Sequence, residues 1–120
     1  MPAKLTLSAV ISQPTGDIIV TEKGRRAWAL LHLINAGAKG CTPIDNPGPR
    51  WSGYVHRLRG NGFVIETINE DHAGSFSGHH ARYRLHSNVV VSGGNLAEWL
   101  ASDEGRREFP RHEFFGRAAA

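Results

Sequence analysis

Apolar residues at helical spacing mark a first segment, from Thr21 to Gly37. One face of this segment carries a broad apolar band: Ala27, Trp28, Leu30, Leu31, Leu33 and Ile34. A band this wide predicts a central helix that is largely buried. Thr21 is the expected N-cap, with Glu22 in the first turn, where a negative charge favours the helix dipole. Gly37 supplies the left-handed position that ends the helix.

A second helical pattern covers residues 50–61. Trp51, Val55 and Leu58 share one face of this predicted helix. The opposite side carries small or basic residues: Arg50, Ser52, Gly53, His56, Arg57, Arg59 and Gly60. A glycine in mid-helix costs about 1 kcal/mol relative to alanine. That cost is explained if a backbone or a phosphate must approach the helix closely at Gly53.

Two strand-like stretches with a glycine-bearing connection predict a hairpin after the second helix. Residues 63–68 are rich in β-branched side chains and form the first strand, and residues 81–85 form the return. Side chains alternate along a strand, so Arg82 and Arg84 are expected to share the outward face.

Three shorter segments complete the first 91 residues. Alternation within residues 1–20 predicts a short edge strand or an extended arm. Residues 43–46 have room for about one helical turn before the turn forced by Pro47-Gly48-Pro49. Val89–Val91 could add a further strand.

The carboxyl-terminal segment begins with a pattern that resembles a capping box, Asn95-Leu96-Ala97-Glu98, and predicts a helix to about Glu108. It carries more apolar surface than a tail needs: Leu96, Trp99, Leu100, Phe109, Phe114 and Phe115. These side chains either dock back onto the core, or form a dimer interface or grip a protein partner. The expected organisation is an arm or strand at 1–20, a central domain at 21–91, and a helix with a tail at 92–120.

Composition and charge narrow the class of protein. A chain of 120 residues with 40% hydrophobic and 21% charged residues fits one globular domain with tails. Residues 21–87 contain nine Lys/Arg against five Asp/Glu, whereas residues 95–120 contain four against five. The basic excess therefore belongs to the central domain and points to a polyanionic partner. Most of the basic residues are arginines, whose planar fork suits phosphates and guanine edges.

Several other functions are not expected. Cys41 is the sole cysteine, so neither an internal disulfide nor a cysteine-based zinc finger can form. His72, His79 and His80 share a loop whose flexible spacing enforces no metal geometry, and no catalytic motif is present, so we expect no metal, no cofactor and no enzyme activity. No secretory signal and no membrane-spanning stretch is found, which makes the cytoplasm or nucleoid the expected compartment.

The order of these elements, together with three stretches of sequence, resembles the winged helix-turn-helix family. The stretches are Ala-Gly-Ala-Lys-Gly-Cys-Thr (36–42), Val-His-Arg-Leu-Arg-Gly-Asn-Gly-Phe-Val-Ile-Glu-Thr (55–67) and His-Ala-Arg-Tyr-Arg-Leu (80–85). They are similar to small winged-helix proteins of bacteria and their prophages. The resemblance implies an α+β fold, in which a three-helix core carries a β-hairpin wing and is followed by a carboxyl-terminal helix. It departs from the family at residues 43–49, which shorten the second helix.

The same resemblance implies a recognition helix at 50–61 and a wing at 63–85. The helix side chains Arg50, Ser52, His56, Arg57 and Arg59 could enter a major groove, where each good arginine–guanine pair is worth about 1–3 kcal/mol. The alternative is an exposed basic face that only keeps the protein soluble.

The remaining cations are expected to contact the sugar–phosphate backbone. Arg82 and Arg84 on the wing could reach phosphates or a narrow minor groove, or could only protect a strand edge. His79 and His80 are placed at the wing tip, facing phosphate. Lys23, Arg25 and Arg26 could grip a phosphate from the start of the first helix, although solvated surface is the alternative.

Two functions follow from these expectations. The first is a sequence-specific regulator that binds double-stranded DNA, and as a dimer it would suit paired half-sites. The alternative is a winged-helix adaptor that binds a protein through its aromatic carboxyl-terminal segment.

Overall fold

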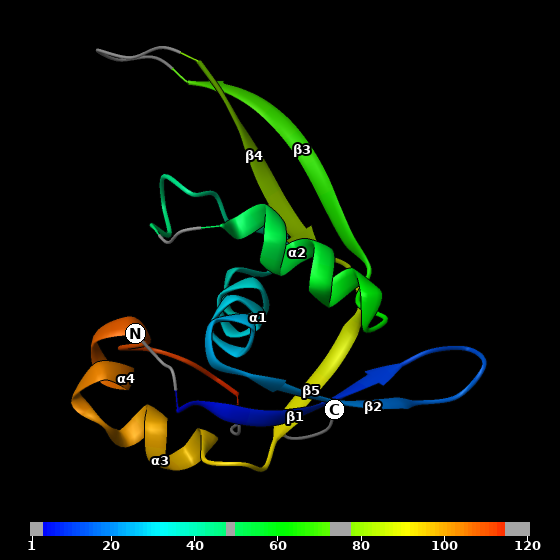
Figure 1. Ribbon diagram of the computed structural model, residues 1–120, viewed down its shortest axis with the longest axis vertical. Helices are drawn as coiled ribbons and strands as arrows, with labels where there is room; N and C mark the ends of the chain where they lie inside the picture. The colour runs from blue at the N-terminus through cyan, green and yellow to red at the C-terminus, as the bar shows by residue number, and fades with distance from the viewer. Residues whose placement is uncertain (1–3, 48–49, 73–77, 115–120) are drawn as a thin grey trace.

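Helix α1 (Gly24–Ala36) lies between two antiparallel β-sheets in the computed structural model, which describes residues 4–47, 50–72 and 78–114. In Figure 1 one sheet lies below α1, whereas helix α2 (Trp51–Gly60) and a long hairpin lie above it. Two short helices, α3 (Leu96–Ala101) and α4 (Asp103–Glu108), lie at the lower left of the domain in this view. The fold is a winged helix with additional carboxyl-terminal helices.

The lower sheet has three strands in the order β2 (Ile18–Lys23), β1 (Thr6–Ser12), β5 (Asn88–Ser92). Both pairs are antiparallel. Leu5, Leu7, Ala9 and Ile11 are buried, and the residues between them are at least partly exposed, as the alternation predicts. The edge-strand prediction is wrong in one respect, because β1 is the middle strand. Its second partner, β5, comes from about 80 residues later in the chain.

The start of α1 also differs from the sequence-based prediction. Thr21 and Glu22 lie in β2, where they pair with Ser8 and Leu7, and the helix begins only at Gly24. Thr21 is therefore not the N-cap. Lys23 occupies that position and makes no side-chain capping bond. Strand pairing with β1 satisfies the backbone groups that a helical turn at 21–23 would have used.

The described residues between α1 and α2, 37–47 and 50, contain no second α-helix. A short 3-10 helix, η1 (Gly37–Lys39), is followed by a hydrogen-bonded turn in which the Asn46 amide donates to the Thr42 carbonyl at 2.9 Å. The Thr42 hydroxyl also accepts from the Asp45 amide. Pro49, expected near the start of α2, lies outside the described residues.

The wing consists of β3 (Ile65–His72) and β4 (Gly78–Leu85), paired from Ile65–Leu85 to His72–Gly78. An isolated bridge joins Cys41 to Tyr83 and ties the base of the wing to the segment after η1. In Figure 1 the hairpin extends away from the body of the domain. Only its base is thus held by the core.

The carboxyl-terminal helix is divided into two. Ser102 has an extended backbone (ψ 164°), and its hydroxyl accepts from the Gly105 amide as the N-cap of α4. Four of the apolar side chains expected in this region are buried: Leu96, Trp99, Leu100 and Phe109. Phe114 packs partly buried against the same core, whereas Phe115 lies outside the described residues. This segment docks in cis on the domain.

His32 connects α1 to this carboxyl-terminal segment. Its Nε2 atom lies 3.0 Å from a Glu108 carboxylate oxygen, and its ring packs against Trp28 and Phe109. Burial lowers the pKa of His32, and the hydrogen bond to Glu108 opposes that shift.

Candidate nucleic-acid interface

Helix α2 is fixed to the core by its apolar face. Trp51, Val55 and Leu58 are buried, as the helical spacing predicts. The Trp51 ring lies 5.4 Å from that of Trp28, and its indole N–H donates to the Asn46 carbonyl at 2.7 Å. Burying side chains of this size is worth roughly 1.5–3 kcal/mol each. These contacts determine which side of α2 faces solvent.

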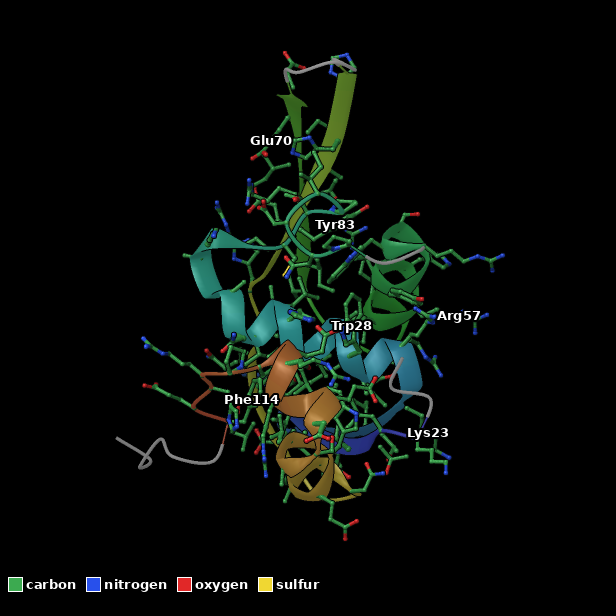
Figure 2. All side chains as sticks on the ribbon, turned by 90° about the vertical axis from the view of Figure 1, so that its left-hand side faces the viewer. Lys23, Trp28, Arg57, Glu70, Tyr83 and Phe114 are labelled. Atoms are coloured by element: carbon green, nitrogen blue, oxygen red, sulfur yellow. The ribbon has the colours of Figure 1, made fainter. Side chains whose placement is uncertain are left out.

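The solvent side of α2 carries the expected polar residues. Ser52, Gly53, His56 and Arg57 are exposed, as is Arg50 just before the helix. Figure 2 shows Arg57 projecting away from the body of the protein. Within the described ranges, neither Arg50 nor Arg57 makes an ion pair with a carboxylate. Both guanidinium groups are available for an external anion.

Gly53 leaves the outer face of α2 without a side chain at this position. Among the described residues, a β-carbon added there would meet only the Arg50 β-carbon, at 3.8 Å, so none of them requires a glycine at this position. The missing side chain instead leaves the outer surface of α2 open to a close approach.

Arg59 differs from its neighbours on α2, because it is bound within the protein. Its guanidinium donates to the Ile65 carbonyl at 3.0 and 2.6 Å and to the Thr67 hydroxyl at 2.7 Å. These bonds join the last turn of α2 to the first wing strand. Arg59 therefore sets the angle between α2 and the wing.

A second basic group lies beside the end of α2. Asn61, which follows the helix, donates to the buried Glu22 carboxylate at 2.7 Å, and Arg26 lies 3.8 Å from the other oxygen of that group. Lys23 is exposed and projects on the same side of the molecule as Arg57 (Figure 2). The start of α1 thus adds cations to the edge of the α2 surface.

The buried Glu22 carboxylate connects Asn61, after α2, with Arg26 in α1. Glu22 is 0% exposed, and burial raises the pKa of its carboxyl, against the lowering effects of Asn61 and Arg26. Arg25 is partly buried, and within the described ranges its Nη1 atom is buried without a hydrogen-bond partner. Of the three cations expected to grip phosphate here, Lys23 is the most accessible.

The wing cations are mostly neutralised by acids on the opposite strand. Arg82 contacts the Glu70 carboxylate through Nε and Nη2, lies 3.8 Å from Asp45, and donates to the Lys39 carbonyl. Its guanidinium holds the pKa of Glu70 below the usual range. Arg84 has a looser partner, with 3.6 Å between its Nη1 atom and Glu66.

The wing histidines follow the same rule. His79 pairs with Asp71, and His80 Nε2 lies 2.9 Å from Glu70. Both pairs are direct cross-strand partners in the hairpin register, where contacts between facing side chains stabilise a sheet. The sequence interpretation missed these carboxylates. Counting back from the tip could have found them, because His79, His80 and Arg84 each face an acid at the matching position, whereas Arg82 faces Ile68 and reaches Glu70 diagonally.

The geometry of the described residues supports neither catalysis by Cys41 nor a metal site. Burial raises the pKa of the Cys41 thiol to about 12, so it remains protonated at neutral pH and is a poor nucleophile. Across residues 4–47, 50–72 and 78–114, no group of three His, Cys, Asp or Glu side chains is placed to hold a metal ion. No helix in the same ranges is both long and apolar enough to cross a bilayer.

A helix packed across a helical core with a hairpin wing directly after it defines a winged helix protein, a class in which DNA binding is the characteristic activity. The chain belongs to the winged helix domain family, whose model matches residues 19–95, more than half of the sequence. No curated protein and no solved structure matches it. Domains of this class typically carry no catalytic machinery.

Proposed function

We propose that the protein is a sequence-specific regulator that binds double-stranded DNA with α2 in the major groove. The observation that carries the proposal is the pair of exposed arginines, Arg50 and Arg57, on the side of α2 opposite its buried face. An arginine fork can take guanine O6 and N7 bidentately, which discriminates among base pairs. Ser52 and His56 stand beside it and can add hydrogen bonds to bases.

Phosphate contacts would then orient the domain on the duplex. Lys23, Arg25 and Arg26 lie at the edge of the α2 surface, and contacts from them would fix the register without selecting a sequence. The wing would follow the neighbouring backbone, with Arg84 as its more available cation, because Arg82 is held by Glu70 and Asp45. Contacts of His79 and His80 with phosphate would compete with Asp71 and Glu70.

We also propose a cellular compartment, an origin and an oligomeric state for this DNA-binding protein. A small winged-helix regulator of this kind fits the nucleoid of a bacterium, in the cytoplasm, and a prophage origin. A homodimer would place two α2 helices on paired half-sites. The aromatic carboxyl-terminal side chains give no comparable support to an adaptor, because Trp99 and Phe109 are buried in the core of the monomer.

A gel-shift experiment on fragmented genomic DNA, at low and moderate salt, tests the proposal. The wild-type protein should retard a subset of fragments, and moderate salt should sharpen that selection by weakening non-specific binding. Arg57→Ala should lose the selection. Arg107→Ala, which removes an exposed arginine from α4, is the matched control and should keep it. Uniform retardation of all fragments by the wild-type protein would contradict sequence-specific recognition.

A further inference from the structure

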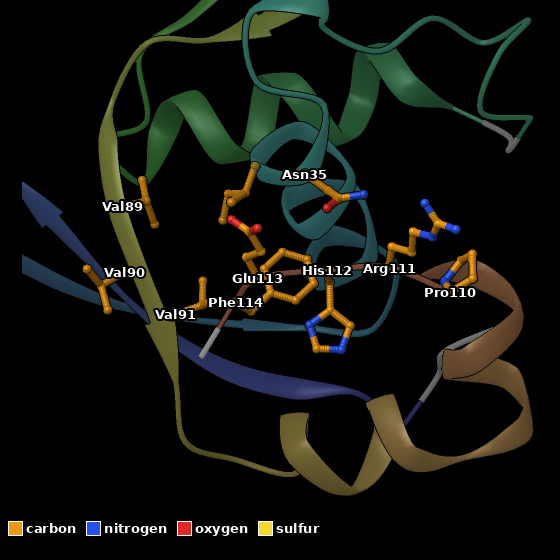
Figure 3. Close-up of a pocket in the computed structure, with 10 residues that line it drawn as sticks. Asn35, Val89, Val90, Val91, Pro110, Arg111, His112, Glu113 and Phe114 are labelled. Carbon is orange, nitrogen blue, oxygen red and sulfur yellow. The ribbon is translucent and has the colours of Figure 1, made fainter. Parts of the chain in front are cut away.

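Within residues 4–47, 50–72 and 78–114, strand β5 leaves one edge of the lower sheet without a partner strand. It pairs with β1 on one side only, because the strand order is β2-β1-β5. An open groove of about 680 Å³ lies along it, walled by Val89–Val91, Ile34 and residues 110–114. Figure 3 shows these walls, with Val89–Val91 on one side of the view and Asn35 and Pro110–His112 toward the other. The groove therefore lies where a further strand would be added.

The residues of β5 themselves lack the usual protection against pairing. Proteins shield strand edges with charges, prolines or bulges, and β5 (Asn-Val-Val-Val-Ser) contains no charged residue and no proline. The other described edge strands are charged. Glu22 and Lys23 lie in β2, and the wing strands carry the paired acids and bases described above. A neutral edge favours a neutral partner strand.

The sequence of β5 is also symmetric in polarity about Val90. In an antiparallel pair of two copies centred on Val90, Asn88 would face Ser92 of the second copy, and Val89 would face its Val91. Polar residues meet polar ones and valines meet valines, as a two-fold symmetric interface requires. We propose that the protein forms a homodimer through β5, which joins the two lower sheets into one six-stranded antiparallel sheet.

The outer face of the sheet agrees with this register. Val10 pairs with Ile19 on β2 and with Val90 on β5, so the three side chains form one row across the face. Ile19 is 72% exposed and Val90 is 63% exposed. Pairing at Val90 brings the rows of the two copies end to end. Val90 of each copy then lies at the centre of the combined row, where it is covered. The inner face of the added strand would lie against Ile34 and Phe114.

The β5 interface rests on the homodimer of the proposed function and specifies its contact surface. It can be tested without DNA, so its failure and the failure of DNA recognition are distinguishable. Analytical ultracentrifugation of the full chain should give a species of twice 13.1 kDa. Val90→Lys places like charges opposite each other and should raise the dimer dissociation constant by about tenfold or more. Ile19→Lys, on the far edge strand, should leave the dimer intact.

Two further variants test the register. Val90→Thr keeps the branched shape without charge and should retain the dimer. Val90→Cys should cross-link with a short bismaleimide, because facing β-carbons in a sheet are about 4.5–5.5 Å apart. Ile19→Cys should not, since five strand spacings of about 4.8 Å separate the two copies. The buried Cys41 should not react.

The outcomes are decisive in both directions. A dimer that Val90→Lys dissociates, and that Val90→Cys traps, supports pairing through β5. A wild-type protein that stays monomeric at every concentration overturns the proposal. So does a dimer that is insensitive to Val90→Lys, or cross-linking of Ile19→Cys as efficient as that of Val90→Cys.

Discussion

The outer face of α2 and the wing carry similar numbers of basic residues but differ in how those residues are bound. On α2, Arg50 and Arg57 are exposed, and the described part of the chain offers them no carboxylate. On the wing, Arg82 and Arg84 each have an acid as a neighbour. The first surface is poised to bind an external anion, whereas the second already contains its own.

This difference shows that a count of charges along the sequence does not measure the charge available to a partner. Exposed ion pairs contribute little to stability, typically 0–1 kcal/mol, but each one still occupies both of its members. A phosphate approaching Arg82 must compete with Glu70 and Asp45. A phosphate or guanine approaching Arg57 displaces only water. We therefore expect α2 to dominate binding and the wing to assist it.

The largest effect should follow from breaking the anchor of α2. Trp51→Ala removes a side chain that is 2% exposed, together with its hydrogen bond to Asn46 and its contact with Trp28. The free energy of unfolding should fall by about 3–5 kcal/mol, since a large cavity replaces the ring. Urea denaturation followed by circular dichroism measures this. A loss below about 1 kcal/mol would show that α2 is held by other contacts.

The next effect separates the two surfaces directly. Arg57→Ala should reduce discrimination between a selected site and random DNA by about 1–3 kcal/mol, because it removes a base contact. Arg82→Ala should leave discrimination unchanged, since that side chain serves the wing. Fluorescence anisotropy with both duplexes measures the two affinities. Equal losses on both duplexes for both variants would contradict the assignment of α2 as the reader.

Removing the acid that pairs with a wing cation should make that cation available to DNA, as the arginines on the outer face of α2 are. Glu70→Gln removes the carboxylate that holds Arg82 and His80. Affinity for random DNA should rise several-fold, and the slope of log K against log salt should steepen by about one as Arg82 gains a phosphate. Glu98→Gln on α3 makes the same change in net charge at an exposed site and is the control. If both variants gain equally, only net charge matters.

The smallest effects should be on the pH dependence of stability, in which the buried Glu22 and the wing residue Glu70 differ in direction. The pKa of Glu22 is raised in the folded protein, so its contribution is complete at low pH and is lost as pH rises from 4.5 through the raised value. The pKa of Glu70 is lowered, so its contribution is present at higher pH and is lost as pH falls through the lowered value.

Glu22→Gln isolates the first of these effects. The variant should remove the decline of stability above pH 4.5 and should be at least as stable as the wild-type protein at neutral pH. Urea denaturation across this pH range measures the difference, with Glu98→Gln as the exposed control. A variant that is less stable at neutral pH would show that the charged carboxylate is needed by Arg26 and Asn61.

The helical part of the fold could be predicted because the relevant information is local. The spacing of Trp51, Val55 and Leu58 identified the buried face of α2, and its limits were correct to one residue. Tertiary pairing overrode local signals elsewhere. Thr21 and Glu22 have the chemistry of a helix start, but pairing with β1 makes them part of a strand.

The candidate site was less accessible to sequence reasoning, for a related reason. Alternation correctly placed Arg82 and Arg84 on one face of β4, but not the acids beside them, because those depend on the register of the hairpin. Likewise, the bonds from Arg59 to β3 depend on the angle at which α2 meets the wing. A residue type can be read from sequence, whereas its partner requires the geometry.

A titration of isotope-labelled protein with a short random-sequence duplex, followed by amide chemical shifts, would show which surface of the protein contacts DNA. If α2 binds DNA, the largest changes should fall at residues 50–57 and at Lys23–Arg26, with smaller ones along the wing. Changes concentrated on α3 and α4, with α2 unaffected, would contradict DNA binding through α2.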